Sequence, residues 1–76
     1  MTQKVPVITG GELVKALEKI GFVIRRQKGS HIHMYRDLEN KRVTVPVHKG
    51  RNMPVGTLKA ILKDADLTVD QLRDIL

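Results

Sequence analysis

The 76-residue sequence has no cysteine and no tryptophan, and its only aromatic side chains are Phe22 and Tyr35. Without cysteine, a disulfide framework and a Cys-ligated zinc site are both excluded. The length allows one small domain with a thin core and excludes a second. No apolar run approaches the ~18 residues of a membrane span, and residues 1–8 lack the apolar segment of a signal peptide. We therefore expect a soluble, cytoplasmic domain.

Acidic residues are also scarce, with eight Asp and Glu against 14 Lys and Arg, for a net charge of +6. The excess is concentrated in residues 22–51, which carry eight basic and two acidic side chains together with all three histidines. A local basic field of this kind favours a polyanionic partner, most often nucleic acid. The alternative is a solvated basic face with no specific partner.

The first helix has a clear start and a clear stop. Thr9 and Glu12 have the spacing of a capping box, and Ile8 and Leu13 occupy the two positions of a hydrophobic staple. Gly21 is a suitable terminator, because glycine accepts the left-handed conformation that follows many helices. The sequence therefore predicts a helix between Thr9 and Gly21.

Two further helices are predicted near the C-terminus. One begins near Pro54, since proline suits the first turn of a helix. Thr68 and Gln71 then repeat the capping-box spacing at the start of a short last helix. The buried stripe predicted for the helix near Pro54 consists of Leu58, Ile61, Leu62 and Ala65.

Between these helices, the side chains alternate as they do in strands. A tight connection at Gln27–Ser30 and a polar turn at Asp37–Lys41 separate the segments. Pro46 cannot donate to a ladder, so the third strand is expected to be an edge or to end there. Short connections favour an antiparallel meander. The prediction is an α+β fold of order α-β-β-β-α-α, with helices on one face of a three-stranded sheet and strands at residues 22–27, 31–35 and 43–47.

A His-x-His-x-Tyr pattern lies on the second of these strands. If the intervening residues face the helices, then His31, His33 and Tyr35 lie in a row on the open face. These side chains are either ordinary exposed residues, ligands of a metal or groups for acid–base chemistry. A metal site would use both histidines with His48 as a third ligand. It is disfavoured by the basic surroundings and by the lack of a nearby carboxylate.

Acid–base chemistry on RNA is the third interpretation. Imidazole exchanges protons near neutral pH, and RNA supplies its own nucleophile in the 2′-hydroxyl, so no metal is required. A positioned proton-transfer group contributes about 10²–10⁴-fold, and the remaining rate comes from holding the phosphate and stabilising its charge. Gly29 would allow the backbone to approach the phosphate. Basic candidates for holding the phosphate are Lys28, Arg36, Lys49 and Arg51.

Two ordered motifs carry a family resemblance. Gly29-Ser30-His31-x-x-x-Tyr35, followed by Val43-Thr44-Val45-Pro46-x-His48-x-Gly50, resembles the HicA (YcfA-like) toxins of bacterial toxin–antitoxin systems. The resemblance extends over Gly11–Leu76, with residues 1–8 as an N-terminal extension of a single domain, 1–76. One departure is Asp66, which follows Ala65 where family members often have glycine. Asp tolerates the left-handed conformation better than most residues.

The resemblance implies a fold similar to the double-stranded-RNA-binding domain and a ribonuclease that cleaves mRNA without a metal or other cofactor. It also implies inhibition by a HicB-like antitoxin, and it assigns the catalytic histidine, which follows Gly-Ser, to His31. Two alternatives stay open: a non-catalytic RNA-binding module on the same fold, and an interaction protein whose basic face docks an acidic partner. The expected RNA-binding residues are Lys28, Gly29, Ser30, His33, Tyr35, Arg36, His48, Lys49 and Arg51.

Overall fold

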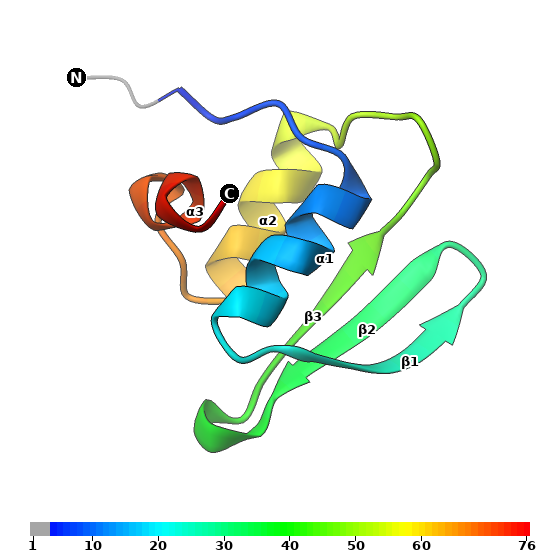
Figure 1. The fold of residues 1–76 in the computed structure, drawn as a ribbon, viewed down its shortest axis with the longest axis vertical. Coiled ribbons are helices and arrows are strands. Elements are labelled where there is room, and N and C mark those ends of the chain that lie inside the picture. Colours follow the sequence, from blue (N-terminus) through cyan, green and yellow to red (C-terminus); the bar gives the residue numbers. More distant parts are fainter. Residues whose placement is uncertain (1–3) are drawn as a thin grey trace.

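A computed structural model of the chain describes residues 4–76, so the first three residues of the expected N-terminal extension lie outside the described part. The fold is the predicted small α+β arrangement, in which a helix, three antiparallel strands and two further helices follow one another (Figure 1). The elements are α1 (Gly10–Lys19), β1 (Val23–Lys28), β2 (His31–Arg36), a 3₁₀ turn η1 (Asp37–Glu39), β3 (Lys41–Pro46), α2 (Val55–Asp64) and α3 (Val69–Ile75).

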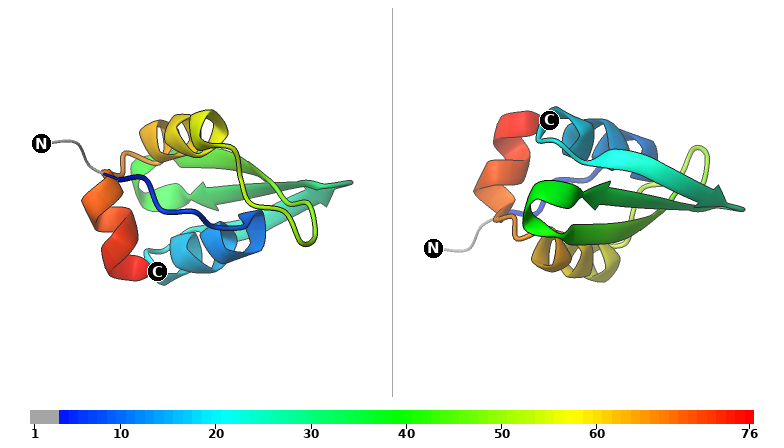
Figure 2. Two further views of the ribbon diagram at one scale, coloured as in Figure 1. Left: turned by 90° about the horizontal axis from the view of Figure 1, so that it is seen from above. Right: turned by 90° about the horizontal axis from the view of Figure 1, so that it is seen from below.

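The three strands form a meander in the order β1-β2-β3, so β3 is an edge strand and ends at Pro46, as predicted. Both α1 and α2 contact β3, and α3 packs against α1. Seen from above, the helices lie nearer the viewer than the strands, and seen from below, the strands lie nearer (Figure 2). One broad face of the sheet is therefore left open to solvent.

Both predicted capping boxes are present. The Thr9 hydroxyl accepts a hydrogen bond from the Glu12 backbone N–H at 3.1 Å, and the Glu12 carboxylate accepts one from the Thr9 N–H at 2.9 Å. Thr68 and Gln71 repeat this exchange at the start of α3. Gly21, with a φ of 97°, ends α1 in the conformation that glycine accepts most readily. Local sequence signals therefore set the ends of these helices.

The end of α2 shows what Asp66 does at the position after Ala65. Pro54 caps the start of this helix, and Asp66 adopts a φ of 59° just after its end. The Asp66 carboxylate also lies 3.8 Å from the Lys41 ammonium group at the start of β3. Asp66 thus takes a left-handed position of the kind that glycine accepts most readily, and it adds an ion pair to β3.

The core lies between the sheet and the helices and contains the predicted stripe of α2. The β1 strand differs from its prediction. Its pairing with β2 shifts between Ile24 and Arg26, so the regular alternation expected over residues 22–27 is wrong. A bulge inserts one unpaired residue and turns the following side chains to the other face. All six β1 residues of this edge strand are exposed, including Val23 at 48% and Ile24 at 47%.

Among residues 4–76, no helix has the length and apolar character that crossing a membrane would require.

Candidate active site

The open face of the sheet is defined by the cross-strand register. Met34 is fully buried in the core and Ile32 packs against that core, so the alternate residues of β2 point the other way. The pairing sets Thr44 opposite His33 and Arg42 opposite Tyr35 on β3. On β1, Lys28 lies opposite His31 and Arg26 opposite His33. We call this surface the open face; its residues are Arg26, Lys28, His31, His33, Tyr35, Arg42 and Thr44.

His31 is the first residue of β2 and directly follows the turn that joins it to β1. Its side chain is exposed, and no hydrogen bond or ion pair within residues 4–76 engages its ring. Gly29 has a φ of 58°, and a Cβ at this position would meet nothing within 4 Å. The backbone beside His31 is therefore open to a bulky anion such as a phosphate.

This turn is fixed to the far end of β3. The Val47 backbone N–H donates to the Ser30 carbonyl at 2.6 Å. A hollow of about 570 Å³ runs from the turn along the start of β2. Its lining residues are Lys28, Gly29, Ser30, His31, His33 and Thr44. Five of the residues expected to handle RNA thus share one depression.

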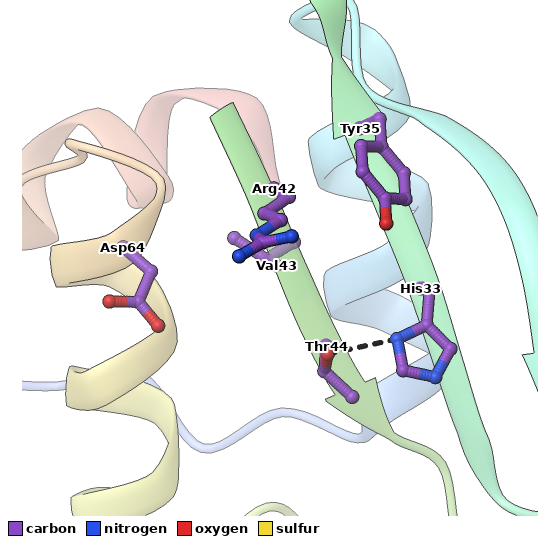
Figure 3. A pocket seen from close by; sticks show the side chains of 6 residues that line it. All are labelled: His33, Tyr35, Arg42, Val43, Thr44 and Asp64. Carbon is purple, nitrogen blue, oxygen red and sulfur yellow. Dashed lines mark hydrogen bonds between the residues drawn. The ribbon is translucent and has the colours of Figure 1, made fainter. Parts of the chain in front are cut away.

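His33 is the histidine whose ring is held in place. Its Nδ1 lies 3.1 Å from the Thr44 hydroxyl oxygen, across the strand pair. The other ring nitrogen points away from Thr44 (Figure 3). The hydroxyl either donates to or accepts from Nδ1, according to the tautomer of the ring. This contact leaves one nitrogen of a fixed imidazole available on the open face.

A second hollow, of about 220 Å³, begins at His33 and continues away from the turn. In Figure 3, Tyr35 and His33 on β2 form one side of this hollow and Asp64 at the end of α2 forms the other. Arg42 on β3 lies between them. The residues lining it are His33, Tyr35, Arg42, Val43, Thr44 and Asp64. Sequence reasoning missed Arg42, Thr44 and Asp64. The alternation of β3 could have indicated the first two, whereas the position of Asp64 depends on how α2 packs beside β3.

Tyr35 has a neighbour that the sequence did not indicate. The Arg25 guanidinium lies over its ring, 5.8 Å from the centroid, and also pairs with the Asp37 carboxylate. Arg25 is the residue that the register leaves unpaired, between Ile24 opposite Met34 and Arg26 opposite His33. Beyond the bulge, Arg26 and Lys28 lie on the open face opposite His33 and His31, so the shift in register adds these two cations to the face.

Arg36 does not belong to the open face. Its Nη1 donates to the Ile20 carbonyl at the end of α1 at 3.0 Å, and its guanidinium lies over the Phe22 ring at 4.9 Å. Its Nε is 2.8 Å from a Glu39 carboxylate oxygen. Arg36 therefore lies apart from the other expected RNA-binding residues of β2, and its contact with RNA stays a prediction. Its place in β2 has the same parity as Met34, so it faces the helices.

His48, Lys49 and Arg51 lie exposed in the loop between β3 and α2. The Arg51 N–H donates to the His48 carbonyl at 3.0 Å, and Gly50 has a φ of 75°, so this part of the loop is a tight turn. Within the described chain, no hydrogen bond joins His48 to His31. The Val47–Ser30 hydrogen bond nevertheless anchors the loop next to the turn that carries His31.

Among residues 4–76, no three His, Asp or Glu side chains lie close enough together to hold a metal ion. The two histidines of β2 instead face Arg26 and Lys28 across the strand pair. A cation at this position would be repelled by both of these charges.

Fold and site together define a small α+β protein with a basic, histidine-bearing sheet face. A family model described as HicA toxin of bacterial toxin-antitoxin matches residues 10–67, which include α1, the whole sheet and α2. The chain therefore belongs to the HicA toxin family of bacterial toxin–antitoxin systems, and membership in such a system implies an antitoxin partner. A search of curated proteins gives no match.

Proposed function

We propose that this chain is a metal-independent endoribonuclease that cleaves mRNA in the bacterial cytoplasm and uses His31 as its proton-transfer residue. The HicA family is in general one of ribonuclease toxins. The observation that carries the proposal is the position of His31, whose free imidazole lies exposed beside an open turn and opposite Lys28. A phosphate at the turn would meet both the imidazole and the ammonium group.

In the proposed reaction, the His31 imidazole takes the proton of the ribose 2′-hydroxyl. The 2′-oxygen attacks the adjacent phosphorus as the bond to the 5′-oxygen breaks, which leaves a 2′,3′-cyclic phosphate and a 5′-hydroxyl. The departing oxygen needs a proton, so a second group is required. We assign this role to His33, which lies about 7 Å further along the same face by the strand rise and is oriented by Thr44.

The remaining residues of the site would bind and position the RNA. Lys28 and Arg26 lie beside the two histidines on β1 and would neutralise the backbone phosphates. Gly29 and Ser30 leave the backbone open to the scissile phosphate, and Tyr35 provides a surface on which a base can stack. The proposal extends this binding role to the three exposed residues of the loop after β3, His48, Lys49 and Arg51.

The first test is incubation of the purified protein with a long single-stranded RNA in excess EDTA. We expect fragments with 2′,3′-cyclic phosphate and 5′-hydroxyl ends, because the nucleophile and both proton-transfer groups are independent of metal. Intact RNA that is nevertheless bound, with a steep dependence on salt, would favour the alternative of a non-catalytic RNA-binding module. Cleavage that appears only when Mg²⁺ or Zn²⁺ is restored would contradict metal independence.

The antitoxin is proposed to be a HicB-type protein that covers the open face. The supporting observation is that the basic residues and both histidines of β2 share this one surface, so a single docked partner can exclude RNA from all of them. We expect saturating cognate antitoxin to stop RNA cleavage and to protect the face from solvent exchange. Full nuclease activity in the saturated complex would contradict this docking mode. If this chain binds the antitoxin but has no nuclease activity when free, a pure interaction role would be favoured.

A further inference from the structure

The second hollow of the open face is lined by two opposite charges for which the described residues provide no partner. Arg42 and Asp64 both line it, yet neither takes part in an ion pair or a side-chain hydrogen bond within residues 4–76. Elsewhere the chain pairs such groups, as in Lys41 with Asp66. The Arg42 guanidinium can only donate hydrogen bonds and the Asp64 carboxylate can only accept them. Together they can hold a ligand that has both acceptors and donors.

The position of this hollow relates it to the proposed cleavage site. His33 lines both depressions, so the second hollow begins where the one beside His31 ends. An RNA strand whose phosphate lies between the two histidines would therefore place a neighbouring base in the second hollow. The hollow, of about 220 Å³, is large enough to be occupied by a single flat base.

The chemistry of the lining selects among the four bases. The Asp64 carboxylate can only accept hydrogen bonds, whereas the Arg42 guanidinium can only donate them. Guanine presents two adjacent donors, N1–H and the N2 amino group, on its Watson–Crick edge, and two acceptors, O6 and N7, toward the major groove. Adenine and cytosine offer a carboxylate one amino donor beside an acceptor nitrogen, and uracil offers one N–H between two carbonyls. Guanine alone satisfies both side chains with two hydrogen bonds each.

We propose that this hollow is a guanine-binding subsite next to the cleaved phosphodiester, with Asp64 and Arg42 as its specificity-determining residues. The proposal rests on the ribonuclease function proposed above. Tyr35 supplies the aromatic surface against which the base packs, and Asp64 reaches the base from the last turn of α2 (Figure 3). The subsite thus combines residues from β2, β3 and α2.

The test maps the 5′ ends of fragments produced from a long RNA by three proteins: wild type, Asp64→Asn and Asp74→Asn. We expect wild type to cut next to guanine roughly tenfold more often than next to the other bases, as a bidentate contact allows. Asp64→Asn should lose this preference while still cutting at other sites, because its amide turns one acceptor into a donor. Asp74→Asn makes the same chemical change at an exposed position of α3 and should keep the preference. Cut sites without guanine enrichment in wild type, or an unchanged preference in Asp64→Asn, would overturn the proposal.

A binding measurement separates this proposal from the question of catalysis. Short 2′-deoxy oligonucleotides cannot undergo the reaction, so their affinity reports on the subsite even if the protein never cleaves RNA. We expect wild type to bind a pyrimidine oligonucleotide with one central guanine roughly tenfold more tightly than the same sequence with adenine. Arg42→Lys keeps the charge but loses the planar fork, and it should reduce this ratio without changing the salt dependence. Equal affinities of wild type for the two oligonucleotides would overturn the subsite and leave the nuclease proposal intact.

Discussion

His31→Ala is expected to lower the rate of RNA cleavage by about 10²–10⁴-fold, the range that a positioned proton-transfer group contributes. The fold should be unaffected, because the His31 side chain is exposed and no partner within residues 4–76 depends on it. Exposed substitutions of this kind change stability by about 0.5 kcal/mol or less. The measurement is single-turnover cleavage in EDTA, with thermal unfolding and RNA affinity recorded on the same protein. A variant that cleaves as fast as wild type would remove His31 from the mechanism.

The other histidines provide the comparison for this variant. A base that must be neutral and an acid that must be protonated give a bell-shaped dependence of rate on pH. If His33 is the acid, His33→Ala should lower the rate and remove the decline on the alkaline side. His48→Ala should keep both sides of the profile, whatever it does to RNA affinity. Loss of the alkaline decline in His48→Ala instead would assign the acid role to the loop after β3.

The sequence predicts the fold well where the signals are local. A capping box involves residues three apart, and the exchange between Thr9 and Glu12 forms without help from distant parts of the chain. The alternation in β2 likewise set Met34 in the core and His31 on the opposite face. The left-handed conformation of Asp66 follows from a single position after a helix. Each of these features depends on one segment and its immediate neighbours.

The features that were missed depend on contacts between segments. The bulge in β1 is visible only once β1 is paired with β2, and it sets Arg26 and Lys28 opposite His33 and His31 on the open face. Asp64 joins the second hollow because α2 packs beside β3, some twenty residues along the chain. Arg36 is a different case. Its parity in β2 already indicated the helix side, whereas its positive charge suggested contact with RNA.

Gly10→Ala is expected to destabilise the fold strongly, although it adds a single methyl group. A Cβ at Gly10 would lie 2.3 Å from the Pro46 carbonyl oxygen and 3.0 Å from the Val47 Cα, so the start of α1 and the end of β3 would have to move apart. Overpacking of this kind costs about 1–3 kcal/mol, which corresponds to a fall in Tm of roughly 5–20 °C for a domain of this size. The measurement is thermal unfolding followed by circular dichroism.

Gly11→Ala is the matched control, since it makes the same change one residue further along α1. A Cβ there has one neighbour within 4 Å, the Thr9 hydroxyl oxygen at 3.9 Å, so the gain in helix propensity should leave the Tm unchanged or raise it. Pro46 directly precedes Val47, whose N–H holds the turn beside His31 through Ser30. A displaced β3 end should therefore also lower RNA cleavage by the folded Gly10→Ala protein, whereas Gly11→Ala should cleave like wild type. Equal stability of the two variants would mean that α1 can move away from β3 at no cost, and the site would then not depend on this contact.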